Sequence, residues 1–179
     1  MHVDTAPAGR TAHPRDGRPA PTWAVRAAHL IPLVTLPSGL WRLALVAGVP
    51  IGASAFGEPV HLGVGESVYI VSLSLVSELL ALLSLGLVQP WGEVLPRRLP
   101  LLGGRRVPPA FAVTTATAGA VAVTLIFGYA AWGVVVKGND LDFSPAGFAL
   151  LVACYAPLLL WGPLLLAVTA AYRRRRCRD

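Results

Sequence analysis

The sequence predicts an all-α membrane protein, a four-transmembrane-helix bundle with the N-terminus and the C-terminus both in the cytoplasm. Two observations support this: four long apolar stretches, and arginines that gather on one side of them. Hydrophobic residues make up 55% of the 179 residues and charged residues 13%, against roughly 45–50% and about 25% in soluble domains. This balance predicts a bilayer as the main solvent and argues against nucleic-acid binding, despite a net charge of +6.

Each of the four stretches is long enough to cross the hydrocarbon core, which takes about 20 apolar residues in a helix. They cover about residues 27–49, 67–88, 111–136 and 147–172. The first contains Pro32, Pro37 and Arg42, and a central arginine costs about 2.5 to 3.5 kcal/mol on the insertion scale. A re-entrant or interfacial segment is therefore the alternative to a full span there.

The remaining residues form two tails beside one transmembrane domain, residues 23–172. Residues 1–22 are polar and rich in proline, without the short apolar region and cleavage site of a signal peptide, so we expect a disordered cytoplasmic tail. Residues 173–179 form a basic cytoplasmic tail.

Within the domain, Trp41 and Trp161 lie too deep for the membrane interface and are expected to pack between helices.

The positive-inside rule sets the orientation. Thirteen of the fourteen arginines lie before the first span, between the second and third, or after the fourth. The other two loops contain four acidic residues and one basic residue, which are Glu58, Glu66, Asp140 and Asp142, and Lys137. Both termini are therefore predicted to be cytoplasmic. Anionic lipid headgroups are the expected contacts of the basic residues at the membrane surface, which are Arg97, Arg98, Arg105, Arg106, Arg173, Arg174, Arg175 and Arg176.

Two residues of opposite charge fall within the spans. Arg42 lies about seven residues inward from the outer end of the first span and Glu78 about eleven inward in the second, a difference of roughly 6 Å at 1.5 Å per residue. An ion pair across this hairpin would offset part of the cost of burying either charge. The pair is either a structural lock or a proton or substrate site.

Helix spacing also predicts two faces. Serines give the second span a polar stripe that could line a pathway, formed by Ser67, Ser74, Ser77 and Ser84 around Glu78. Small residues every four positions give the third span a packing face, formed by Ala112, Ala116, Ala120, Thr124 and Gly128. Pro157 and Pro163 should kink the fourth span.

The sequence offers no basis for a metal or a cofactor. His29 and His61 lie on opposite sides of the membrane, and Cys154 and Cys177 lie at different depths without a CxxC spacing. Nucleophile-elbow, phosphate-cradling and metal-ligand motifs are not found. We therefore expect neither an enzyme nor a cofactor.

Three segments carry a resemblance to other proteins: PLVTLPSGLWRLAL, QPWGEVLPRRLPLLGGRRVPP and YAPLLLWGPLLLAVTAAY. The chain after Thr22 resembles a group of uncharacterised actinobacterial four-span integral membrane proteins that share PSGLWR, a PWG…GGRRVP loop and WGPLL. The resemblance implies a four-span fold in a bacterial plasma membrane and supplies no activity. A non-enzymatic accessory or envelope-associated component, packed with its own copies or with a membrane-protein partner, is the preferred function. The alternative is a small proton-coupled or substrate transporter that uses Arg42 and Glu78.

Overall fold

The structure is a computed structural model that describes residues 20–52, 54–55, 58–59, 62–89, 108–139 and 143–176. Its first two spans are α1 (Thr22–Val46) and α2 (Val64–Leu83), the latter extended by the 3-10 helix η1 (Ser84–Leu87). The third is α3 (Pro109–Lys137), and the fourth consists of α4 (Pro145–Tyr155), the 3-10 helix η3 (Ala156–Leu160) and α5 (Trp161–Arg176). Between α1 and α2, β1 (Ser54–Ala55) pairs antiparallel with β2 (Glu58–Pro59).

The prediction of four helices able to cross a membrane is confirmed, and indicates a multi-pass membrane protein. The helical segments Thr22–Val46, Val64–Leu87, Pro109–Lys137 and Pro145–Arg175 are long and apolar enough. Helix α1 continues through Pro32 and Pro37 over 25 residues, or about 37 Å at 1.5 Å per residue. It therefore has the length of a full span rather than of a re-entrant segment.

The prolines of the fourth span lie where that span is divided. Pro157 is at the start of η3, and Pro163 is the third residue of α5. A proline is tolerated in the first turn of a helix because its missing N–H would have no intrahelical partner there. The expected kinks therefore take the form of a break between α4 and α5, bridged by five residues of 3-10 helix.

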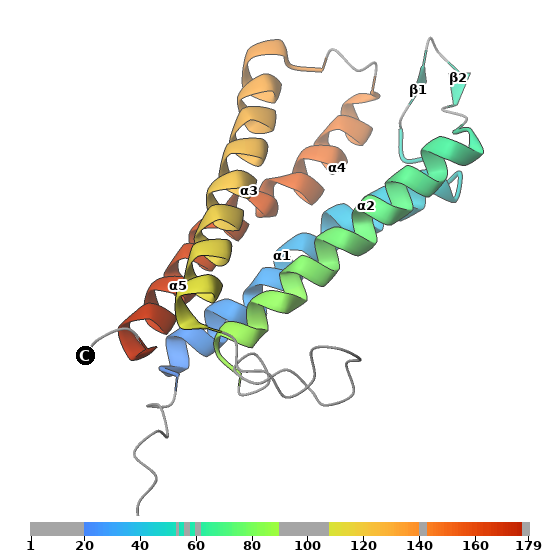
Figure 1. Cartoon of the computed structure of the whole chain (residues 1–179). Helices are drawn as coiled ribbons and strands as arrows, with labels where there is room; N and C mark the ends of the chain where they lie inside the picture. Colours follow the sequence, from blue (N-terminus) through green and yellow to red (C-terminus); the bar gives the residue numbers. More distant parts are fainter. Residues whose placement is uncertain are drawn as a thin grey trace, which may run out of the picture.

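The helices form two hairpins, α1 with α2 and α3 with α5, which meet where α1 packs against α5. Helix α4 and η3 also contact α1, whereas α2 does not pack closely against α3 in the described part of the chain. Figure 1 shows the start of α1, the start of α3 and the end of α5 at one end of the bundle, which we call the terminal end. The opposite end, which carries β1 and β2, is the loop end.

Small side chains let α1 and α5 approach closely. Ala24, Ala28 and Ile31 of α1 and Val168 of α5 are fully buried. Close approach through small residues is the usual way for helices to associate in lipid, where apolar side chains gain little by leaving the hydrocarbon. Outward-facing leucines such as Leu79 remain exposed, as expected for a surface that faces lipid.

Helices α3 and α5 meet at the middle of the predicted small-residue face. Ala120 is fully buried, and a Cβ atom at Gly162 would overlap Thr124 Oγ1 and lie 2.8 Å from the Ala120 carbonyl oxygen. Ala112 and Ala116 pack at the edge of the core. A Cβ atom at Gly128 would meet no atom within 4 Å, because the upper part of α3 diverges from α4 (Figure 1).

The loop end is closed by contact between glycines. Gly52 has φ +76°, and a Cβ atom on Gly147 would lie 2.8 Å from the Ile51 carbonyl oxygen and 2.9 Å from the Gly52 Cα. The Ser144 N–H donates to the Gly52 carbonyl at 3.1 Å, and its hydroxyl accepts from Gly147 N. The start of α4 is thereby fixed against the segment after α1.

Candidate functional site

Polar side chains gather where α1 packs against α2. Thr35, Ser38 and Arg42 lie at spacings of three and four residues and therefore share one face of α1. Thr35 Oγ1 donates to Glu78 Oε2 of α2 at 3.0 Å and also lies 3.0 Å from the Pro32 carbonyl oxygen. Thr35 and Ser38 are fully buried, so this contact lies inside the hairpin.

The second carboxylate oxygen of Glu78 lies against the backbone of α1. A Cβ atom at Gly39 would be 3.4 Å from Glu78 Oε1, at the limit of ordinary van der Waals contact. The carboxyl group therefore lies directly over Gly39. Glu78 Oε1 is buried and has no hydrogen-bond partner, which is an uncommon state for a buried polar atom.

Arg42 makes different contacts from those predicted. Its Nη2 atom donates to Ser38 Oγ at 3.4 Å, and its guanidinium lies 6.0 Å from the centre of the Tyr155 ring. Among these described side chains, Arg42 and Glu78 form no direct ion pair. The Glu78 carboxyl group instead lies against Thr35 and Gly39 of α1, whereas the Arg42 guanidinium is directed to Ser38 and to the ring of Tyr155 in α4.

The serines of α2 donate their hydroxyl groups to their own helix. Ser74 binds the Ile70 carbonyl at 2.8 Å and Ser77 the Leu73 carbonyl at 2.8 Å. Ser67 donates to the Gly63 carbonyl at 3.0 Å and Ser84 to the Ala81 carbonyl at 2.6 Å. Ser74 and Ser84 are buried. The stripe is therefore a packing face whose donors are already used, with acceptor lone pairs as its remaining polar capacity.

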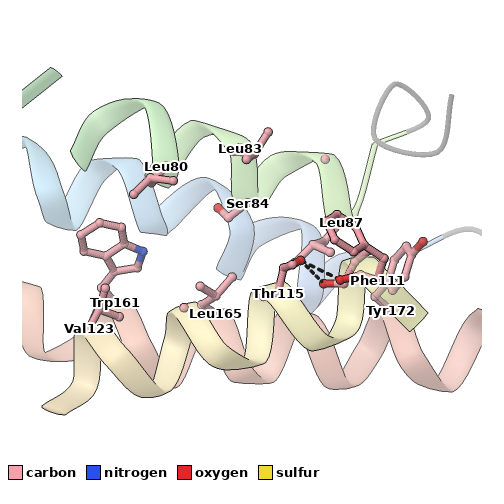
Figure 2. Close-up of a pocket in the computed structure, with 14 residues that line it drawn as sticks. Leu80, Leu83, Ser84, Leu87, Phe111, Thr115, Val123, Trp161, Leu165 and Tyr172 are labelled. Atoms are coloured by element: carbon pink, nitrogen blue, oxygen red, sulfur yellow. Dashed lines mark hydrogen bonds between the residues drawn. The ribbon is translucent and has the colours of Figure 1, made fainter. Parts of the chain in front are cut away.

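An apolar cavity of about 350 Å³ lies between α2 with η1 on one side and α3 on the other, over α5. Figure 2 shows its leucine and aromatic walls, which include Leu80, Leu83, Leu87, Phe111, Leu165 and Tyr172. Sequence reasoning did not identify this cavity. Gly119, which lines it and leaves open space where a Cβ would be, is the residue that could have suggested it.

Three of the predicted lipid-contact arginines can be placed. Arg173 and Arg174 line a second hollow between α3 and α5 with Thr117 and Thr169. Arg175 instead donates to the Leu87 carbonyl at the end of η1 at 2.8 Å, and lies 5.8 Å from the centre of the Tyr172 ring. The side chains of Arg97, Arg98, Arg105, Arg106 and Arg176 lie outside what the structure describes.

Comparison with known proteins adds no family to this picture. No protein-family model matches the chain, and neither a curated protein nor a solved structure shows significant similarity to it. Function is therefore inferred from the geometry of the helices.

Proposed function

We propose that this chain is a multi-pass protein of a bacterial plasma membrane, with both termini in the cytoplasm, and that it acts as a non-enzymatic accessory or envelope-associated component. In this proposal the loop-end half of α3 binds a second membrane helix, from another copy or from a partner protein. The basic residues at the terminal end contact anionic lipid headgroups.

The uncovered half of α3 is the observation that supports this proposal. Helix α3 packs against α5 and η3 but diverges from α4 toward the loop end (Figure 1). Cβ atoms at Gly128 and Gly133 would meet no atom within 4 Å, while Tyr129 is 80% and Trp132 65% exposed. Glycines beside large aromatic residues provide the close approach and contact area that helix association in a bilayer uses.

The Glu78 site fits a supporting role in this proposal. Its carboxyl group is enclosed by Thr35 and Gly39 of the same hairpin, and nearby Ser74 and Ser77 donate to their own helix. A polar contact of this kind fixes the register between two helices. The hairpin would then be the rigid element against which α5 and α3 are positioned.

The test is site-specific photo-crosslinking in intact membranes. A photoreactive phenylalanine analogue at Tyr129 should give one discrete crosslinked species, and the same group at Leu79 of α2 should give none. Gly128→Leu should remove the species without loss of folded protein, because the added side chain meets open space within the chain. Gly119→Leu, on the same helix but away from this surface, is the matched control. Equal crosslinking from both probes, or none from Tyr129, would refute the role of α3.

A transporter is the second candidate, favoured by the unpartnered Glu78 Oε1 atom. A buried carboxyl oxygen without a donor is a position where a proton or a cationic group could bind. Glu78→Gln keeps an acceptor for Thr35 and removes the exchangeable charge. In proteoliposomes with a pH gradient and a trapped pH-sensitive dye, the native chain should collapse the gradient faster than Glu78→Gln, and Ser77→Ala should match the native chain. Equal rates for native and Glu78→Gln would exclude this candidate.

A further inference from the structure

The geometry points to a lipid site: we propose that the cavity between α2 and α3, which we call the α2–α3 groove, holds one acyl chain of an anionic phospholipid. The headgroup of this lipid lies beside Arg175 at the terminal end. The proposal requires that the helices lie in a membrane but does not depend on the accessory role of α3, so either can fail without the other.

The groove faces the hydrocarbon with apolar walls. Leu80 is 53% and Leu83 62% exposed on one wall, and Phe111 is 62% exposed on the other. Leu165 of α5 forms the buried floor. A groove between two membrane helices with walls of this kind is filled by hydrocarbon, because water would find almost no hydrogen-bonding partners there.

The dimensions match a single chain of one leaflet. The groove extends along α3 from Phe111 to Val123, twelve residues or about 18 Å at 1.5 Å per residue. This is slightly more than half of the roughly 30 Å hydrocarbon core. Its volume of about 350 Å³ is at the small end of the usual range for ligand sites, about 300 to 1,000 Å³. One slender chain that enters at the terminal end would therefore reach the midplane.

Aromatic side chains close the deep end of the groove. Trp161 is 4% exposed, lines the groove (Figure 2) and stacks on Phe127 with ring centres 6.1 Å apart. Trp161 is the first residue of α5, directly after the break in the fourth span, and α5 packs against α3. The end of the acyl chain would therefore meet the fixed, flat surface of the Trp161 ring.

Positive charge lies at the open end. Arg175 donates to the carbonyl of Leu87 and lies over the ring of Tyr172, and both of these residues line the groove. Its guanidinium is therefore held at the mouth, at the level where the end of η1 meets the end of α5. Arg173 and Arg174, on the same turn of α5, face the second hollow instead. The guanidinium of Arg175 therefore supplies the charge at the mouth, and a phosphodiester without a compensating cationic group is the complementary headgroup.

The test uses the full chain in nanodiscs of equal parts phosphatidylglycerol and phosphatidylcholine, followed by native mass spectrometry. The native chain should retain one phosphatidylglycerol. Gly119→Leu, which extends a side chain into the groove, should lower retention at least fivefold, whereas Gly128→Leu should not. Arg175→Gln should retain a lipid but lose the preference for phosphatidylglycerol. Equal retention by Gly119→Leu and Gly128→Leu, or no retained lipid on the native chain, would overturn the proposal.

A second measurement does not depend on how well Gly119→Leu folds. Phosphatidylglycerol brominated near the end of its acyl chain should quench the fluorescence of the native chain more than that of Trp161→Phe, and the difference should saturate with lipid concentration. A quenching difference that rises linearly without saturation, or no difference, means that Trp161 meets only bulk lipid and refutes the site. Photo-crosslinking from Tyr129 should be unchanged by Gly119→Leu, which separates this test from that of the accessory role.

Discussion

Replacing Thr35 with valine should weaken the α1–α2 hairpin by removing its bond to Glu78. Valine has nearly the shape of threonine, so the buried volume is kept and only the hydroxyl group is lost. In the native chain this hydroxyl donates to Glu78 Oε2 at 3.0 Å, and Glu78 Oε1 has no partner. After the substitution, neither oxygen of the Glu78 carboxyl group has a hydrogen-bond donor from α1.

The magnitude follows from the kind of bond. A hydrogen bond to a charged group contributes about 1.5 to 3 kcal/mol in soluble proteins, while side-chain bonds between membrane helices average about 0.6 kcal/mol and reach about 1.7 kcal/mol. Because the acceptor is a carboxyl group and Thr35 is fully buried, we expect a coupling free energy of about 1 to 2 kcal/mol. Thr35 also lies 3.0 Å from the Pro32 carbonyl oxygen, so part of the cost of Thr35→Val is independent of Glu78.

A double-mutant cycle separates these contributions. Unfolding free energies would be measured in mixed micelles for Thr35→Val, Glu78→Leu and the double variant, with Ser77→Ala as the control because its hydroxyl binds only its own helix. The effects of the two single changes should fall short of additive by the coupling energy. Additivity within about 0.5 kcal/mol, the usual result for independent sites, would show that the bond does not hold the hairpin together.

Three further predictions concern packing, helix capping and orientation. Gly162→Ala should destabilise the chain by about 1 to 3 kcal/mol through overpacking, since its Cβ would overlap Thr124 Oγ1. Gly133→Ala, which meets open space, should instead gain up to about 1 kcal/mol in the same unfolding assay, because alanine has the higher helix propensity. Equal effects of the two changes would contradict this packing. Arg175→Gln should increase hydrogen exchange over residues 84–89 because the Leu87 carbonyl loses its cationic partner, and unchanged exchange there would show that the bond does not hold η1. A fluorescent protein fused to either terminus should fold and fluoresce, whereas a periplasm-dependent phosphatase at the same positions should be inactive; active phosphatase would reverse the predicted orientation.

The helical spans could be predicted because length and apolar composition determine them directly. The structure has helices at all four predicted stretches, and Trp41 and Trp161 are buried as expected. The break at η3 was harder to predict. Pro157 and Pro163 predict a disturbance of the helix, but whether it becomes a kink or a change of helix type depends on how α4 and α5 pack against α1.

The polar site was only partly predictable. Arg42 and Glu78 stand out because charges are rare within spans, and an estimate of depth from the sequence gave an offset of roughly 6 Å. That offset was not bridged by a direct contact, and Thr35 became the partner of Glu78 instead. Partners across a helix pair depend on rotation and tilt, which apolar periodicity does not determine. The proximity of Gly39 to Glu78 Oε1 had only one signal in the sequence, which is that Gly39 lies about one helical turn before Arg42 in the same span.

The order in which the hairpins are completed has a consequence for biogenesis. Helix α1 carries Arg42 and two prolines and is the least favourable of the four segments to place in lipid alone. The buried hydroxyl group of Thr35 in α1 can bond to the Glu78 carboxyl group only when α2 has also been synthesised. Helix α1 should therefore enter the bilayer together with α2 during translation. In a chain that is truncated before α2, α1 should remain at the membrane interface and be open to degradation.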